Sequence, residues 1–224
     1  MFCYIFSFIQ SISLLRHLDL FEGSCVYEEG PNKILCAVIG PLETKTRDET
    51  VGEATIDVVI RPDIGVPSIK DIQMEQIIWR TISPIIIRTM YPHSLIQVVI
   101  QIVSCEKSEN VIVSLLSAIL NATFISLLDS GVAMMNTFSA VSLAILSKEG
   151  ETSFILNPSL KILNDATSTH ILCYAFPDEK LILCDSIGFF TENQFIEILS
   201  KALIACKDIH EKIKAEIMKK IKEK

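Results

Sequence analysis

The sequence predicts an α+β fold in a single domain, and three observations lead to that prediction. Strand-like and helix-like segments are mixed along the chain, with tight turns between neighbouring strands and few short parallel crossovers. One long apolar segment has helical periodicity, and a second has the two-residue alternation of a strand. With 224 residues, half of them hydrophobic and 21% charged, the chain is long enough to bury a substantial core around those two segments.

The helical segment is Val113–Asp129. Its apolar residues recur at steps of three and four, so we expect a helix that is buried over most of its circumference. No charge interrupts it before Asp129, and Asp129-Ser130-Gly131 supplies a stop, because glycine adopts the left-handed conformation at little steric cost. The strand segment, Phe138–Leu146, is apolar on both faces, which is typical of a strand inside a covered sheet.

The chain begins with an apolar segment, Met1–Leu15, that carries no charge before Arg16. A signal peptide would have positive charge before its apolar run and a small-residue cleavage site after it, and neither is evident. The segment is also shorter than the roughly 20 residues of a membrane span. We expect residues 1–17 to be an apolar N-terminal extension or an added strand, with a secretory signal as the alternative, and residues 18–224 to form the folded domain.

A β-hairpin is expected next. Cys25–Tyr27 and Lys33–Ile39 are rich in strand-forming residues and flank a Gly-Pro-Asn turn, and Gly40-Pro41 is expected to end the second strand. Leu42–Glu53 is polar and mixed in charge, so we expect a surface loop. Ala54–Pro62 alternates as a half-exposed strand does.

A helix and a long strand follow. Ser68 is a candidate N-cap for a helix that continues toward Met90, and Pro84 inside it predicts a kink or a break into two helices. Leu95–Val103 is rich in β-branched residues and predicts a strand. Ser104–Asn110 is a polar turn that leads to the central helix.

The C-terminal part predicts further strands at Phe154–Leu156, His170–Phe176 and Leu181–Asp185, the last two joined by a tight turn. A final helix opens near Thr191. Its expected apolar seam is formed by Ile196, Leu199, Leu203, Cys206, Ile209, Ile213, Ile217 and Ile221. The lysines near its end lie off this seam, which is typical of a solvated helix face.

Composition limits the function. The 20 Lys and Arg against 27 Asp and Glu give a net charge of −7, which argues against a chain that binds nucleic acid alone through its net charge. The seven cysteines are odd in number, lack C-x-x-C spacing and lie mostly in apolar surroundings, so we expect reduced core thiols. The four histidines show no metal-ligand spacing, and we expect no metal site and no cofactor.

Three blocks of sequence resemble the RNase PH family. They are Cys36-Ala37-Val38-Ile39-Gly40-Pro41, the helix from Ile119 through Val132, and the strand Ala140–Ile145, and they occur in the family's order from about Leu18 onward. The resemblance implies an RNase PH-like fold, in which mixed β-sheets with packed helices contain a βαβ core like that of some ribosomal proteins.

Further blocks are similar to one branch of this family, the non-catalytic ring subunits of the eukaryotic RNA exosome. They are Gly40-Pro41-Leu42-Glu43-x-Lys45-x-Arg47, Val59-Ile60-Arg61-Pro62, and Ile82-Ser83-Pro84 with Arg88 and Tyr91-Pro92. In that branch RNase PH-like subunits form a hetero-hexameric ring that works with cap subunits bearing RNA-binding domains and with a catalytic exosome nuclease, and RNA threads the channel. The resemblance implies a scaffolding role in rRNA processing and mRNA turnover, in the nucleus, nucleolus and cytoplasm, without a membrane.

The residues that the family's reaction needs are missing. Phosphorolysis of RNA requires donors that hold inorganic phosphate and an acid that protonates the leaving 3′ oxygen. The family's phosphate-binding Gly-Thr-Arg run falls on Ser114-Leu115-Leu116, so leucine replaces the arginine that would clamp the anion. The family's first acid falls on Asn157 and its second near Ser168-Thr169, while Asp165 is expected to be a solvated turn residue. The resemblance therefore implies a chain without catalytic residues.

Five cations are candidates for contacts with RNA in the channel: Lys45, Arg47, Arg61, Arg80 and Arg88. Ordinary solvated cations are the alternative for each of them, since positive side chains are common on any protein surface. Two other functions stay open beside the scaffold. One is an active phosphorolytic 3′-to-5′ exoribonuclease of the RNase PH type, and the other is a stand-alone homodimeric module that binds or hydrolyses nucleic acid.

Overall fold

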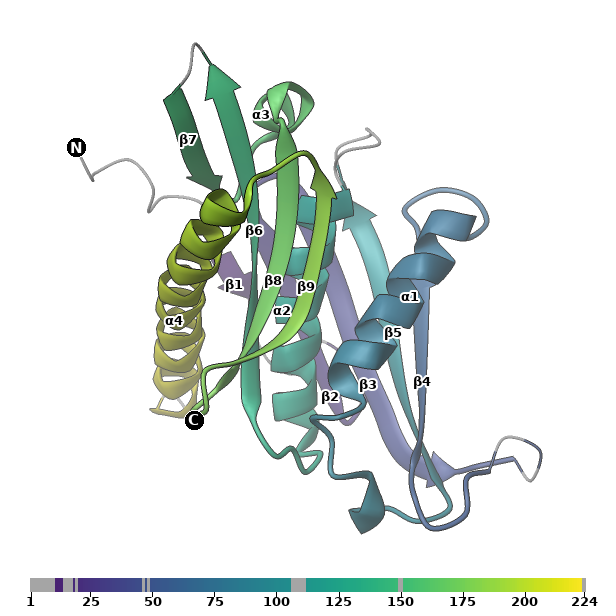
Figure 1. The fold of residues 1–224 in the computed structure, drawn as a ribbon. Coiled ribbons are helices and arrows are strands. Elements are labelled where there is room, and N and C mark those ends of the chain that lie inside the picture. Colours follow the sequence, from purple (N-terminus) through teal and green to yellow (C-terminus); the bar gives the residue numbers. More distant parts are fainter. Residues whose placement is uncertain are drawn as a thin grey trace.

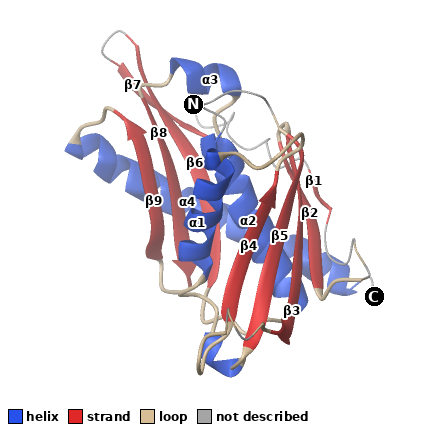
Figure 2. Cartoon of the chain, turned by 90° about the vertical axis from the view of Figure 1, so that its right-hand side faces the viewer, coloured by secondary structure: helices blue, strands red, loops and turns tan. Residues whose placement is uncertain are grey.

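The computed structural model of the protein describes residues 11–13, 18, 20–45, 47, 49–105, 112–148 and 151–222. Two β-sheets enclose helices between them, and a further helix covers the outside of one sheet (Figures 1 and 2). The first sheet has the strand order β1-β2-β3-β5-β4 and the second has the order β7-β6-β8-β9. This arrangement confirms the predicted α+β class.

The five-stranded sheet consists of β1 (Ser11–Ser13), β2 (Gly23–Glu29), β3 (Asn32–Glu43), β4 (Thr55–Arg61) and β5 (Ser94–Ser104). Strands β4 and β5 are parallel and are connected through a helix, which makes a βαβ unit. The other pairings in this sheet are antiparallel. Strand β1 pairs with β2 at the sheet edge, so the added-strand interpretation of the N-terminal segment holds for these three residues, while residues 1–10 lie outside the described part.

The predicted hairpin of β2 and β3 is confirmed, with Cys25 opposite Cys36 in the register. The expectation that Gly40-Pro41 ends the second strand is wrong, because β3 continues to Glu43. The register shifts between Ile39 and Leu42, which indicates an irregularity of the β-bulge type at the proline. Such a bulge accommodates a proline that could not donate to a regular ladder.

Helix α2 (Ile112–Ser130) lies between the two sheets. It packs against β2 and β3 on one side and against β6 (Thr137–Lys148) and β8 (Ser168–Phe176) on the other. By length and composition it could cross a membrane, but 78% of its most apolar stretch is buried inside the protein, as in a core helix. Both predictions for this region, a helix buried on most sides and a covered strand after it, are confirmed.

Two glycines allow this packing. Gly131 has a φ of 71°, the left-handed conformation expected at the end of α2. At Gly23, a Cβ atom would lie 2.3 Å from the carbonyl oxygen of Ser126. Strand β2 therefore approaches α2 more closely than any residue with a side chain would permit.

Helix α1 (Ile69–Ile82) begins as predicted, with Ser68 as the N-cap of a capping box. It ends before Pro84, and a short 3₁₀ helix, η1 (Arg88–Met90), follows. The expected break at the proline is confirmed. Because proline lacks the backbone N–H and its ring crowds the preceding turn, the helix cannot continue through it.

The second sheet also contains β7 (Glu151–Leu156) and β9 (Lys180–Gly188). A short helix that the sequence did not predict, α3 (Leu160–Asp165), connects β7 to β8. Its six residues are too few for a periodic pattern to be recognised.

Helix α4 (Glu192–Lys222) packs against β6 and β8 on the face opposite α2 (Figure 1). The predicted seam is correct from Leu199 to Ile217 but wrong at its start, because Ile196 is exposed, and the side chain of Ile221 lies outside the described ones. Ile198 and Ala202 are buried instead, at the steps of four residues that continue the stripe N-terminally.

Asn121 joins the two sheets through α2. Its side chain donates to the carbonyl oxygen of Ala140 on β6 at 3.0 Å and accepts from the Ala140 backbone N–H at 2.9 Å. It also donates to the hydroxyl oxygen of Tyr27 on β2 at 3.4 Å. Buried polar groups require such partners, so this amide sets how β2, α2 and β6 lie relative to one another.

Candidate functional site

The first turns of α2 are where the sequence resemblance places the family's phosphate site. Leu115 and Leu116 retain only 6% and 0% of their side-chain exposure, so both belong to the core between the sheets. The first turn of α2 contains no acidic residue, and its only polar side chain beside these leucines is that of Ser114. A helix N-terminus attracts anions through its free N–H groups, but within the described first turn of α2 no side chain adds a positive charge to them.

Two residues of the β2–β3 hairpin, Glu29 and Asn32, lie beside this turn. They face each other across the hairpin, and both are buried, at 6% and 1% exposure. The Asn32 side-chain amide donates to the Ser114 hydroxyl oxygen at 3.1 Å. Among the described residues, neither Glu29 Oε2 nor Asn32 Oδ1 has a hydrogen-bond partner.

Asn157, the position of the family's first acid, lies at the same place. Burial raises the pKa of Glu29 to about 7, and hydrogen bonding to Tyr27 and Asn157 opposes that rise. Asn157 has a φ of 47°, its backbone N–H donates to the Ser142 carbonyl at 2.9 Å, and its side-chain oxygen accepts from the Ser142 hydroxyl at 3.4 Å. Asn157 and Ser114 are far apart in the sequence. Both contact the end of the β2–β3 hairpin, Asn157 through Glu29 and Ser114 through Asn32.

We call this group the buried polar cluster. Its members are Tyr27, Glu29, Asn32, Ser114, Asn121, Ser142 and Asn157. None of them is a cation, and the unpartnered atoms are both oxygens that accept hydrogen bonds. An anion such as phosphate needs donors, so the cluster does not suit it.

Sequence reasoning assigned Glu29 and Asn32 to a turn and missed their burial. A polar residue on each side of a Gly-Pro pair is an ordinary turn signal. Only the register of the hairpin, in which these two residues form the last pair of the ladder, could have indicated that both side chains point toward α2.

The family's second acid position is occupied by hydroxyl and imidazole groups. The Ser168 hydroxyl lies 3.0 Å from His170 Nε2, and His170 Nδ1 lies 2.8 Å from the Ser186 hydroxyl. The ring of Phe190 meets the imidazole edge-on at 4.9 Å, and burial lowers the pKa of His170. Asp165, the one acid nearby in the sequence, is exposed at the end of α3.

The candidate RNA-binding cations do not converge on one surface. Lys45 and Arg47 lie in the loop that leads to the first residue of β4, whereas Arg61 is the last residue of that strand (Figure 1). A strand of seven residues is about 20 Å long. Arg88 lies at the first end, because its guanidinium is 2.8 Å from the Glu53 carboxylate. Lys45, Arg47 and Arg88 therefore lie toward the first end of β4, and Arg61 lies at its other end.

Arg80 lies on α1 and lines a shallow groove of about 400 Å³ between α1 and β4. We call it the β4–α1 groove. Asp57 and Glu75 line the same groove, so the positive charge of Arg80 has acidic neighbours. Since β4 is an edge strand, its outer backbone groups need partners. The Trp79 indole N–H donates to the Ile56 carbonyl at 3.1 Å, and Glu75 accepts from the Ile60 N–H at 2.7 Å.

Comparison with known proteins decides the family. The family model of RNase PH, described as the 3′ exoribonuclease family, domain 1, matches residues 11–133. The chain belongs to this family. It is 28% identical over 204 residues to the exosome complex component RRP46 of Saccharomyces cerevisiae, with 88% of this chain and 89% of the yeast protein covered.

Solved structures show the same RNase PH fold. The crystal structure of rice Rrp46 matches with a TM-score of 0.82 at 23% identity and covers 93% of both chains. A chain of the archaeal exosome core matches with a TM-score of 0.68 at 15% identity, covering 92% of this chain and 88% of that one. The similarity to yeast RRP46 confirms the sequence resemblance to the branch that contains ribosomal RNA-processing protein 46.

The described residues also bear on metal binding and on disulfide formation. Within the part of the chain that the structure describes, no group of three or more His, Cys, Asp or Glu side chains could hold a metal ion. The six described cysteines are free thiols, and four of them, Cys25, Cys36, Cys173 and Cys206, are buried. Cys3 lies outside the described residues.

Proposed function

We propose that this RNase PH chain is a non-catalytic structural subunit of the RNA exosome core ring. The observation that carries the proposal is the burial of Leu115 and Leu116 at the position of the family's anion clamp. An arginine there would hold phosphate with two hydrogen bonds, whereas a buried leucine has no group that can bind an anion. The relatives that share most of this chain's length are named as exosome components.

In this role the chain would alternate with other RNase PH-like subunits in a hetero-hexameric ring. Cap subunits with RNA-binding domains and a catalytic exosome nuclease would complete the complex and carry out 3′-to-5′ processing of rRNA and turnover of mRNA. The nucleus, nucleolus and cytoplasm are the places where we expect it. The loop cations Lys45 and Arg47 are the first candidates for contacts with threaded RNA, and Arg61, Arg80 and Arg88 are the others.

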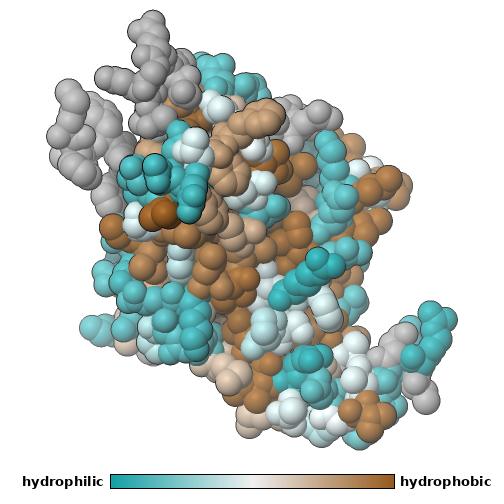
Figure 3. Space-filling model, in the orientation of Figure 1, coloured by the Kyte–Doolittle hydropathy of each residue, from teal (hydrophilic) through white to brown (hydrophobic). Residues whose placement is uncertain are grey.

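Two exposed apolar surfaces suit a chain that has a neighbour on each side. One surrounds the β4–α1 groove and contains Ile64, Val66, Ile69, Ile72 and Trp79, each at least 42% exposed. The other lies around β9 and the start of α4 and contains Leu181, Ile187, Phe189, Phe190 and Ile196. Apolar colour is prominent on the face drawn in Figure 3. Apolar surfaces of this kind are typical of protein–protein contacts.

An active phosphorolytic exonuclease is the alternative. The burial of Glu29 beside Asn157 is the observation that favours it. This residue brings a carboxyl group beside Asn157, and its pKa of about 7 suits a general acid at neutral pH. The cluster around it still lacks a cation for phosphate, so we rank this function second.

The two functions differ in a simple assay. Purified chain would be incubated with a single-stranded oligoribonucleotide, with and without inorganic phosphate, and release of nucleoside diphosphates would be measured. The scaffold proposal expects no phosphate-dependent release from a well-folded sample. Release that Glu29→Gln abolishes would overturn the proposal in favour of the enzyme. Salt-sensitive RNA binding by the isolated chain would instead support the stand-alone module.

A second experiment tests the scaffold directly. The tagged chain would be recovered from cells, and the chains bound to it would be identified. The proposal expects other RNase PH-like subunits in equal amounts. Recovery as a free monomer would overturn it.

A further inference from the structure

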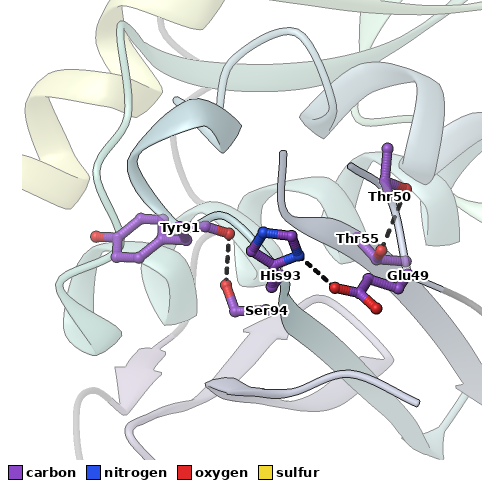
Figure 4. Close-up of polar contacts among 6 residues, drawn as sticks. All are labelled: Glu49, Thr50, Thr55, Tyr91, His93 and Ser94. Carbon is purple, nitrogen blue, oxygen red and sulfur yellow. Dashed lines mark hydrogen bonds and ion pairs between the residues drawn. The ribbon is translucent and has the colours of Figure 1, made fainter. Parts of the chain in front are cut away.

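The loop between β3 and β4 carries Lys45 and Arg47 in its first half, and its second half is fastened to the segment before β5. Figure 4 shows this place, with Glu49, Thr50 and Thr55 on one side and Tyr91, His93 and Ser94 on the other. Three contacts join the loop to this segment, and they come from Glu49, Glu53 and Ala54.

The segment that receives the loop is itself anchored to the core. The backbone N–H of Ile87 donates to the Ala133 carbonyl at 2.9 Å, and the N–H of Met135 donates to the Ile85 carbonyl at 2.8 Å. The Tyr91 hydroxyl accepts from the Ala133 N–H at 3.2 Å. Residues 85–91 are therefore tied to the chain that leaves α2, and they offer a fixed base.

Arg88 attaches the end of the loop to that base. Its carbonyl oxygen accepts from the Ala54 N–H at 3.0 Å, and its guanidinium lies 2.8 Å from the Glu53 carboxylate. Within the loop, the Thr50 and Thr55 hydroxyl oxygens lie 3.3 Å apart, within hydrogen-bond distance. These contacts hold residues 50–55 in place.

His93 makes a further contact with the loop. Its Nδ1 atom bonds the carboxylate of Glu49, two residues beyond Arg47. His93 has a φ of 60°, in the left-handed region, where glycine and asparagine are favoured and other residues incur a cost in free energy. The Ser94 hydroxyl closes the same turn by donating to the Tyr91 carbonyl at 2.6 Å. The ring of His93 thus links this turn before β5 to a carboxylate of the loop.

We propose that His93 is a positioning residue, which holds the loop through Glu49 so that Lys45 and Arg47 are presented to RNA phosphates. The inference rests on the proposed function, in which these two cations contact RNA. It adds a residue that touches no RNA itself and acts through the loop.

The first test measures the loop without RNA. His93→Asn keeps a residue suited to the left-handed conformation but removes the ring that reaches Glu49. Backbone amides of residues 49–55 are expected to exchange with deuterium about two- to fivefold faster, the range expected for loss of one exposed ion pair. Glu49→Gln should act in the same direction, and the double variant should change exchange no more than the larger single change. Asp178→Asn, which removes an ion pair with Lys180 on the other sheet, is the matched control and should leave this loop unchanged.

The second test measures RNA binding by the assembled ring, with a labelled single-stranded oligoribonucleotide at several salt concentrations. Lys45→Ala with Arg47→Ala should lower the slope of log K against log salt by about 0.7 for each lost phosphate contact. His93→Asn should weaken binding at low salt by about two- to fivefold, because the cations remain but are less well placed.

The outcomes separate the two proposals. Faster exchange together with weaker binding in His93→Asn supports the inference. Unchanged exchange and binding in His93→Asn, beside weaker binding in the Lys45 and Arg47 variant, overturns the inference and leaves the RNA contact standing. Unchanged binding in the Lys45 and Arg47 variant overturns the RNA contact of this loop, and the positioning role of His93 fails with it.

Discussion

Glu29 is the residue whose environment departs most from what its sequence position suggests. A carboxyl group at a hairpin turn is normally solvated, yet here it is 6% exposed and one of its oxygens has no partner among the described residues. Burial favours the neutral form of an acid, and the pKa of Glu29 accordingly rises to about 7. The residue is therefore a source of pH dependence in the stability of the protein.

Glu29→Gln is expected to remove that dependence. Between the ordinary pKa of 4.5 and the folded value of about 7, the native chain holds a proton that the unfolded chain has lost, so stability falls as the pH rises through this window. The free energy of unfolding of the natural chain, relative to the variant, should drop by roughly 2 to 3 kcal/mol between pH 5 and pH 8. Denaturant unfolding at both pH values measures this difference.

Comparing the natural chain with the variant separates the contribution of Glu29 to the pH dependence of stability from the contributions of other titrating groups. Burial lowers the pKa values of His170 and His210, so protonation of these rings destabilises the fold in acid, but both proteins contain them. Glu43→Gln, at an exposed position of β3, is the matched control and should follow the natural chain at both pH values. Parallel pH profiles for the natural chain and Glu29→Gln would contradict the burial of a titrating carboxyl group.

At the scale of elements, α2 is part of the hydrophobic core. The sequence resemblance places the anion site of active family members at the start of this helix. Its buried face includes Leu115, Leu116 and Ile119 near the start and Ile125 and Leu127 near the end. A helix apolar on nearly all sides is stable only between covering layers, and the two sheets provide them. The sequence pattern that identified the helix also places leucines where the resemblance puts the family's phosphate clamp.

Leu116→Ala is expected to destabilise the protein by about 2 to 5 kcal/mol, since it removes a fully buried side chain and leaves a cavity between the sheets. Denaturant unfolding measures the loss. Ile196→Ala on α4, where the side chain is 59% exposed, should cost far less. Equal effects of the two substitutions would contradict the assignment of Leu116 to the core.

Other elements show where sequence patterns fail. Gly40-Pro41 is an ordinary strand terminator, but the strand passes through it because a change of register accommodates the proline. Helix α3 has too few residues to show a periodic sequence pattern. Only the structure shows it, as the connection between β7 and β8. At Gly40-Pro41 pairing between distant segments overrides the local signal, whereas at α3 the local signal is too short to recognise.

At the scale of the whole molecule, each sheet ends in a strand beside exposed apolar residues. Strand β4 ends the first sheet and β9 ends the second, so the two surfaces described above belong to different sheets. A chain with two such surfaces suits a ring, where every subunit has two neighbours. The net charge of −7 is acceptable in that setting, because other subunits can supply positive charge for RNA.

Ile69→Glu is expected to reduce recovery of partner subunits with the tagged chain. The side chain is 76% exposed at the start of α1, so the substitution should not affect folding but would place a charge in an apolar contact. A severalfold loss in co-purification is the expected result. Met218→Glu on α4, also at least half exposed, is the control. Equal recovery with both variants would show that the β4–α1 surface contacts no subunit.

The sequence by itself determined the periodic elements: the buried helix, the covered strand, the hairpins and the break at Pro84. These follow from spacing along the chain, which local physics translates directly into helix or strand. The loss of catalytic groups at Leu116 and Asn157 stays a prediction from the residues at those positions.

Only the tertiary structure decided which distant residues meet. It brought Glu29 and Asn32 to the start of α2, joined Asn157 to them, and separated Arg61 from Lys45 by the length of β4. It also set His93 against Glu49. Such contacts depend on strand register and on the order of strands in each sheet, which many distant pairings determine together and no local pattern specifies.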